Sequence, residues 1–166
     1  MSSSDRELPG HTQMPFLAAP DNVNAESTSG RPGTGAPEPR VVLAESNQQV
    51  RLVVSEILSK CKIAVVGCAL DGAEGIDAVF RLQPDILILD IVMPVMDGIR
   101  VTRLLRRSNS PTKIIILTAI VDESFQRAAM EAGAQAYVIK ARMLSDLPQA
   151  ITAVMSGTEF RSSEEA

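Results

Sequence analysis

The sequence contains few of the residues that build metal and redox centres. It has two cysteines, one histidine and no tryptophan in 166 residues. The spacing of Cys61 and Cys68 matches no zinc or redox motif, so we expect both to be small, buried apolar side chains in a reducing compartment. The one histidine, His11, lies in a region that shows no folding pattern. This scarcity excludes a histidine metal cluster and a Ser-His-Asp triad.

Long hydrophobic runs and excess positive charge are also missing. The longest apolar stretches, such as 63–70, have about eight residues, whereas a membrane-spanning helix needs about 20. The N-terminus has no basic start followed by an apolar run, so it does not resemble a secretory signal. The net charge of −4 gives no electrostatic footprint for nucleic acid or anionic membranes. We therefore expect a cytoplasmic protein that makes no direct contact with nucleic acid or membrane.

The composition changes sharply near residue 40. Residues 1–39 hold six of the ten prolines, together with many Ser and Gly residues. Such a segment buries too little apolar surface to offset the entropy lost on ordering it. We expect a disordered N-terminal tail at 1–39, one folded domain at 40–157 and a C-terminal tail at 158–166. The sequence does not say whether the chain is part of a longer protein.

Within the folded region, short apolar strands alternate with amphipathic helices. The expected strands are 41–44, 63–69, 85–89, 113–117 and 136–139. The expected helices are 47–60, 72–82, 98–107, 123–132 and a last helix that Ser145 caps and Gly157 closes. Five strand–helix units predict an α/β fold with a doubly wound, five-stranded parallel sheet. In such sheets the functional site lies at the carboxyl ends of the strands.

The residues that directly follow the strands carry reactive or charged groups. Glu45 and Ser46 follow the first strand, Asp90 the third, Thr118 the fourth and Lys140 the fifth. Two carboxylates, a hydroxyl and a lysine suit a phosphoryl group together with a hard cation such as Mg²⁺. Aspartate is also a nucleophile that forms acyl phosphates. The pattern predicts that these side chains share one crevice.

Four sequence segments resemble the response-regulator receiver family of two-component signal transduction. They are VVLAES (41–46), LDIVMPVMDG (89–98), ILTA (116–119) and GAQAYVIK (133–140). They occur in the family's order and at its spacing, and the resemblance covers all of residues 40–157. It implies the flavodoxin-like (βα)5 receiver fold.

The resemblance also assigns roles to individual residues. It implies that Asp90 is the phosphoacceptor and that Lys140 contacts the phosphoryl group. Thr118 would be the switch hydroxyl and Tyr137 the switch aromatic residue. The phosphoryl donor would be a histidine kinase or a histidine phosphotransfer protein. The resemblance implies signalling and no enzymatic activity of its own.

The metal ligands depart from the family's pattern. By resemblance, Mg²⁺ would be held by Glu45, Asp90 and the backbone carbonyl of Val92. Family members usually carry a second acidic residue where this chain has Ser46, and that residue contacts the metal directly. A neutral hydroxyl is a poorer ligand, so we expect Mg²⁺ to bind weakly.

Two other functions stay open alongside a phosphorelay receiver. The loss of an acidic residue at Ser46 favours a receiver-like binding module that works without phosphorylation. An enzyme that binds flavin or nucleotide on the same fold is less supported, because no Gly-rich phosphate loop is present. In either receiver function the downstream protein partner would dock on the fourth helix, fifth strand and fifth helix. That face includes Phe125, Tyr137, Ala141 and Arg142, and a homodimer is among the assemblies left open.

Overall fold

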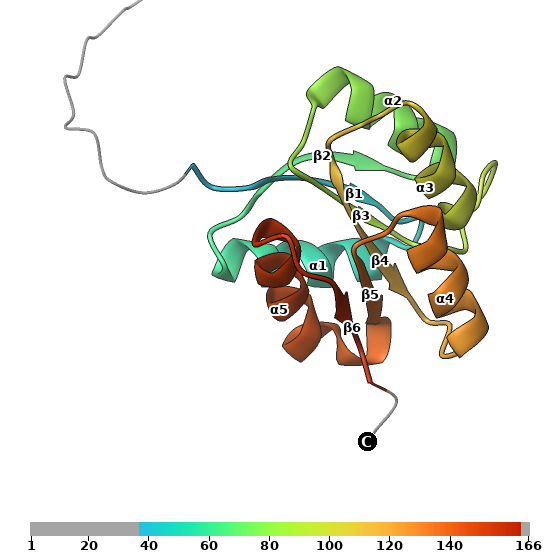
Figure 1. Ribbon diagram of the computed structural model, residues 1–166. Helices are drawn as coiled ribbons and strands as arrows, with labels where there is room; N and C mark the ends of the chain where they lie inside the picture. The colour runs from blue at the N-terminus through green and yellow to red at the C-terminus, as the bar shows by residue number, and fades with distance from the viewer. Residues whose placement is uncertain (1–36, 164–166) are drawn as a thin grey trace, which may run out of the picture. The chain divides into compact units, whose positions relative to one another are not determined.

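The computed structural model describes residues 37–163, which form one α/β domain (Figure 1). Residues 1–36 of the expected N-terminal tail and residues 164–166 lie outside the described residues. The elements are β1 (Arg40–Ala44), α1 (Gln48–Lys60), β2 (Ala64–Ala69), α2 (Gly72–Leu82), β3 (Ile86–Leu89), α3 (Gly98–Arg107), β4 (Lys113–Thr118), α4 (Glu123–Ala132), β5 (Ala136–Ile139), a 3₁₀ turn (Lys140–Arg142), α5 (Met143–Met155) and β6 (Phe160–Arg161).

The strands form one sheet in the order β2-β1-β3-β4-β5-β6, and all neighbouring strands are parallel. β1 pairs with the edge strand β2 on one side and with β3 on the other, so the strand order turns back after β2, which makes the fold doubly wound and confirms the predicted class. The sheet has six strands rather than the five expected. The additional strand, β6, is only two residues long, so it leaves no alternating pattern in the sequence.

Helices cover both faces of the sheet and bury two separate apolar layers. Along β1, Val41 and Leu43 pack toward one face, whereas Val42 and Ala44 pack toward the other. The first layer is closed by α1 and α5, and the second by α2, α3 and α4 (Figure 1). Because the central strands are buried on both sides, they read as continuous apolar runs in the sequence.

Short polar side chains begin four of the five α-helices. Asn47 accepts backbone hydrogen bonds at the start of α1, and Asp71, Asp97 and Asp122 do the same for α2, α3 and α4. These caps satisfy amide groups that have no partner inside the helix. Each cap lies in the turn after a strand, so the caps also fix the loops around the carboxyl edge of the sheet.

The fifth helix begins three residues earlier than predicted, and Ser145 does not cap it. A 3₁₀ turn runs directly into α5, whose first residue is Met143. The hydroxyl of Ser145 donates to the carbonyl oxygen of Arg142 and to Asp146. The continuous turn therefore leaves no extended residue at which a serine cap would form.

The prediction of buried cysteines was wrong, since Cys61 and Cys68 are both exposed. Cys61 is the C-cap residue that follows the last turn of α1. Cys68 lies on β2, the edge strand of the sheet, whose side chains are only partly covered.

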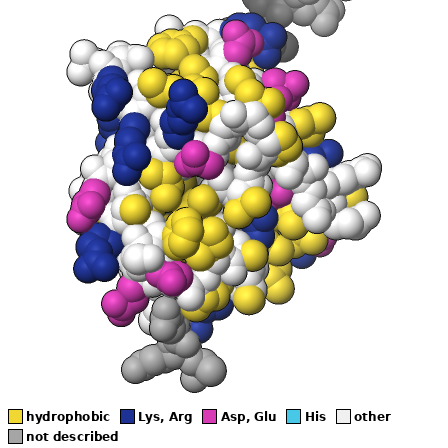
Figure 2. Space-filling model, turned by 90° about the vertical axis from the view of Figure 1, so that its right-hand side faces the viewer, with side chains coloured by type: hydrophobic (Ala, Val, Ile, Leu, Met, Phe, Trp, Pro, Cys, Tyr) yellow, Lys and Arg dark blue, Asp and Glu magenta, His cyan; other side chains and the backbone are white. Residues whose placement is uncertain are grey.

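The surface that carries α3 and α4 is unevenly charged. Figure 2 shows basic side chains gathered toward one side of this face and hydrophobic side chains across its middle. The exposed positions of α3 include Arg100, Arg103 and Arg107, although the whole chain has a net charge of −4. Within residues 37–163, no helix has the length and hydrophobicity needed to cross a membrane.

A pair of Gly→Ala substitutions tests how tightly the loop after β3 is packed. A Cβ atom at Gly98 would lie 2.2 Å from the carbonyl oxygen of Asp90, so the backbone must shift. At Gly75 the nearest atom is the Ala44 Cβ at 3.4 Å, which is an ordinary contact. We expect G98A to lower the free energy of unfolding by about 2 kcal/mol or more. We expect G75A to leave it unchanged or raise it by up to about 1 kcal/mol, because alanine favours the helix. Urea unfolding followed by circular dichroism measures both, and equal effects would contradict the packing argument.

Candidate functional site

Four neighbouring strands bring the predicted site residues to one edge of the sheet. Glu45 directly follows β1, Asp90 follows β3, Thr118 ends β4 and Lys140 follows β5. Glu45, Asp90 and Thr118 are buried, with 1%, 5% and 0% of their surfaces exposed. Two buried carboxylates require compensation, because a charge without a partner is costly away from water.

Lys140 supplies that compensation to both acids. Its Nζ atom lies 2.7 Å from Oδ2 of Asp90 and 2.7 Å from Oε2 of Glu45. Burial works against the lysine charge, but the hydrogen bonds and charges of Asp90 and Glu45 outweigh it and raise the pKa of Lys140. Lys140 therefore stays protonated across the neutral range and loses its charge only in strongly alkaline solution.

The remaining carboxylate oxygens point to backbone amides. Oε1 of Glu45 accepts from the amide of Asn47 at 2.8 Å, and Oδ1 of Asp90 accepts from the amide of Val92 at 3.3 Å. The guanidinium of Arg51 donates to the carbonyl oxygens of Glu45 and Ser46, each at 2.8 Å. The loop after β1 is thus fixed by the carboxylate of Glu45 and by Arg51 of α1.

The loop after Asp90 contains a strained residue. Val95 has φ +66°, a left-handed conformation that is unfavourable for a β-branched side chain. The amide of Met96 donates to the carbonyl oxygen of Pro94 at 2.7 Å, which closes a tight turn around Val95. Val92 and Val95 are 65% and 76% exposed, so this loop presents apolar side chains beside the site.

The donor set fits a hard cation only in part. Oε2 of Glu45 is buried and, apart from its ionic contact with Lys140, has no aligned hydrogen-bond donor. Together with Asp90, it offers carboxylate oxygens, a kind of ligand that Mg²⁺ prefers. Ser46 is exposed and brings no charge. Among residues 37–163, no group of three or more His, Cys, Asp or Glu side chains is arranged to hold a metal.

The two predicted switch residues share one partner in the loop after β4. The hydroxyl of Thr118 accepts from the amide of Ile120 at 3.3 Å. The hydroxyl of Tyr137 donates to the carbonyl oxygen of Ile120 at 2.9 Å. Tyr137 is only 1% exposed, so its side chain does not belong to the open face on which we expected it. Its burial, together with the charges of Asp122 and Asp90, raises its pKa to about 12.

The backbone contacts of Ile120 and Arg51 are features of the site that the sequence did not reveal. Both act through or upon backbone atoms: Ile120 through its amide and carbonyl, and Arg51 on two carbonyl oxygens. Side-chain chemistry gives no signal for such roles. Only the position of Ile120, two residues after Thr118, indicated proximity to the site.

Comparison with known proteins places this fold and site in a family of signalling domains. Residues 41–152 match the family model of the response regulator receiver domain. The chain belongs to this family, as its motifs predicted.

The relatives are longer regulators. The transcriptional regulatory protein LiaR of Bacillus subtilis is 36% identical over 119 residues, which cover 71% of this chain and 56% of LiaR. The response regulator GacA of Pseudomonas viridiflava is 30% identical over 122 residues, covering 73% of this chain and 57% of GacA. This chain therefore spans little more than half the length of these curated relatives.

Solved receiver domains have the same fold. The receiver domain of NarL from Mycobacterium tuberculosis aligns with a TM-score of 0.70 and 28% identity, covering 74% of this chain and 99% of that one. The isolated receiver domain of RcsB from Salmonella enterica serovar Typhimurium, with the phosphomimetic BeF₃⁻, aligns with a TM-score of 0.71 and 25% identity. The alignment covers 76% of this chain and 95% of that one.

Another similar structure holds two RcsB dimers bound to two parallel DNAs, with a TM-score of 0.71 and 25% identity, covering 76% of this chain and 65% of that one. The expectation of no contact with nucleic acid therefore does not extend to the longer relatives.

Removing the lysine charge tests whether Lys140 holds the two acids together. We expect K140M to lower the free energy of unfolding by about 2 kcal/mol, because both buried carboxylates lose their counter-charge while water screens part of the loss. The double variant D90N/K140M should recover part of that stability, since one of the acids is then neutral. Urea unfolding of the single and double variants at neutral pH measures the coupling.

Lys60 provides the matched control. It pairs with Glu56 on the surface of α1, and its side chain is 74% exposed. K60M should therefore unfold like the unmodified protein. If K140M also did so, the ion pairs of Lys140 would not stabilise the domain.

Proposed function

We propose that this domain is the phosphoacceptor of a two-component phosphorelay and that Asp90 receives the phosphoryl group. The supporting observation is the buried Asp90 carboxylate at the end of β3, with the Lys140 ammonium 2.7 Å away. A histidine kinase or a histidine phosphotransfer protein is the donor. The domain changes a binding surface and does not turn over a substrate of its own.

The chemistry requires positioning and neutralisation of charge. A carboxylate oxygen of Asp90 attacks the phosphorus atom of a phosphohistidine, and the bond from phosphorus to the imidazole nitrogen breaks. The imidazole leaves and takes up a proton, and Asp90 becomes an acyl phosphate. Lys140 stabilises the negative charge on the phosphoryl oxygens, which is the main catalytic contribution in such transfers.

Mg²⁺ is the cofactor that the family commonly uses at this site. Glu45, Asp90 and the carbonyl oxygen of Val92 are the residues that would hold it, and it would neutralise charge on the phosphoryl oxygens. The exposed, uncharged Ser46 leaves the site one carboxylate short, so the ion binds weakly.

The switch follows from the shared partner of Thr118 and Tyr137. A phosphoryl group on Asp90 offers new acceptor oxygens to the Thr118 hydroxyl, which then gives up the amide of Ile120. Ile120 also holds the Tyr137 hydroxyl at 2.9 Å, so a shift of this loop moves both residues. The change passes to α4, β5 and α5, the face proposed for a downstream protein partner.

Ser46 also supports a second function, a receiver-like module that binds partners without phosphorylation. In that case the ion pairs of Lys140 with Glu45 and Asp90 are permanent structural contacts. The two functions differ in whether Asp90 can be modified at all.

The longer relatives suggest an output beyond the described residues. LiaR is a transcriptional regulatory protein, and one RcsB structure contains DNA. By analogy, a longer form of this regulator would act on DNA, with the receiver domain controlling its assembly, for instance as a homodimer. A cytoplasmic location would suit that role.

Labelling with acetyl phosphate and Mg²⁺ separates the two functions. We expect the unmodified protein to gain one phosphoryl group by mass spectrometry and D90N to gain none. D77N, which changes an exposed aspartate on α2, is the matched control and should label like the unmodified protein. Equal labelling of D90N would contradict the assignment of Asp90, and no labelling of any variant would favour the phosphorylation-independent module.

Restoring an acid at position 46 tests the weak binding of Mg²⁺. We expect S46D to bind Mg²⁺ at least about tenfold more tightly, a gain of about 1.4 kcal/mol, because ligand charge helps to set the affinity. S46N introduces a side chain similar in size to aspartate but uncharged, and its affinity for Mg²⁺ should stay close to that of the unmodified protein. Calorimetric titration measures the affinities, and the same value for S46D and the unmodified protein would refute the proposal.

A further inference from the structure

The segment after α5 forms a strand along the edge of β5 (Figure 1). The amide of Phe160 donates to the carbonyl oxygen of Gln135 at 3.1 Å, and the amide of Ser162 donates to that of Tyr137 at 2.8 Å. An uncovered edge strand presents unpaired backbone groups to other chains. Residues 158–163, here called the C-terminal strap, satisfy those groups from within the same chain.

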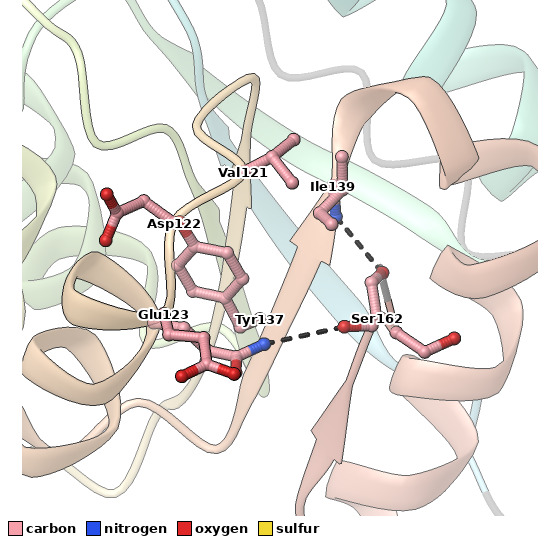
Figure 3. A pocket seen from close by; sticks show the side chains of 8 residues that line it. Val121, Asp122, Glu123, Tyr137, Ile139 and Ser162 are labelled. Atoms are coloured by element: carbon pink, nitrogen blue, oxygen red, sulfur yellow. Dashed lines mark hydrogen bonds between the residues drawn. The ribbon is translucent and has the colours of Figure 1, made fainter. Parts of the chain in front are cut away.

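A buried serine anchors the strap. Ser162 is 4% exposed, and its hydroxyl accepts from the amide of Ile139 at 3.1 Å and donates to Oδ2 of Asp146 at 2.6 Å. Figure 3 shows Ser162 beside Ile139. Asp146 is buried and also accepts from Ser145 and Arg142. Burial alone would raise its pKa, but these hydrogen bonds lower it, so the anchor is an ionised carboxylate at neutral pH.

The strap lies on the face proposed for the downstream partner. A cavity of about 200 Å³ separates it from the start of α4 and is lined by Val121, Asp122, Glu123, Gln126, Tyr137, Ile139, Ser162 and Ser163 (Figure 3). Across it, the Gln126 side chain reaches the carbonyl oxygen of Ser162 at 3.5 Å. The strap therefore contacts β5, α4 and α5 at once and covers the β5 edge.

The anchor binds the residue that precedes Lys140, the lysine that contacts Asp90. The amide that Ser162 binds belongs to Ile139, and the next residue is Lys140, which holds Asp90 and Glu45. The amide of Ser162 itself donates to the carbonyl oxygen of Tyr137, whose hydroxyl donates to the carbonyl oxygen of Ile120. Residues 137–140 thus carry the Tyr137 and Lys140 side chains together with the two backbone groups that bind Ser162.

We propose that the C-terminal strap is a latch that closes the β5 edge while Asp90 is unmodified and detaches when Asp90 is phosphorylated. The trigger rests on the proposed function. A phosphoryl group draws Lys140 away from Glu45 and Thr118 away from Ile120, and both movements displace the backbone that binds Ser162. Detachment uncovers the β5 edge for a protein partner.

Trypsin cleavage after Arg161 in the full chain measures detachment, because a protease needs the segment extended and free of the sheet. Arg161 is exposed, but its backbone is paired with Tyr137. Without any phosphoryl donor, we expect S162A to be cleaved at Arg161 at least tenfold faster than the unmodified protein. S163A makes the same change at the exposed neighbouring residue, and its rate of cleavage at Arg161 should stay within twofold of that of the unmodified protein.

Both substitutions lie next to the cleaved bond, so the rates are corrected by the cleavage rates of short synthetic peptides that carry each of the three sequences. Hydrogen exchange at the Ile139 amide gives a second measurement and should accelerate in S162A alone. Unchanged cleavage and exchange in S162A would overturn the latch, since its anchor would then hold nothing.

Beryllofluoride with Mg²⁺ tests the trigger, and fluorine NMR shows whether it binds. We expect bound beryllofluoride to accelerate cleavage at Arg161 at least fivefold in the unmodified protein and not in D90N. Binding without acceleration would overturn the latch and leave the proposed function intact. Failure to bind would instead count against the proposed function, and with it against the trigger.

Discussion

The site depends on one ammonium group placed between two buried carboxylates. Without Lys140, the end of β1 and the end of β3 would each carry a buried charge that repels the other. The parallel sheet makes this arrangement possible, because the carboxyl ends of its strands lie at one edge. Glu45 and Asp90 are 45 residues apart in sequence, and Asp90 and Lys140 are 50 apart. The ammonium group offsets one of the two negative charges and links both strand ends.

The surroundings hold this arrangement by backbone contacts rather than by more charges. Arg51 fixes the carbonyl oxygens of the β1 loop, Gly98 allows α3 to approach the carbonyl of Asp90, and Ile120 joins Thr118 to Tyr137. Each contact involves a main-chain atom next to a reactive side chain. A small displacement of one of these loops is therefore transmitted to the others through the main chain.

The alternation of strands and helices, the doubly wound sheet and the edge that bears the site could all be predicted from the sequence, because period and strand ends depend on local residue types. The buried position of Tyr137 and the exposure of Cys68 could not, since both depend on which strand lies at the edge. The two-residue strand β6 also had no local signal, because its partners are backbone groups of β5. The early start of α5 could not be predicted either, because the helix continues a 3₁₀ turn and has no side-chain cap at its start.

The burial of Tyr137 has a practical consequence for spectroscopy. The chain has one tyrosine and no tryptophan, so near-ultraviolet absorption and emission come from four phenylalanines and this single phenol. Its hydroxyl is tied to the loop that also holds Thr118, and its pKa of about 12 separates its ionisation from that of a free tyrosine. The protein therefore carries a native optical reporter at the loop that binds both Thr118 and Tyr137, and no label has to be introduced to follow it.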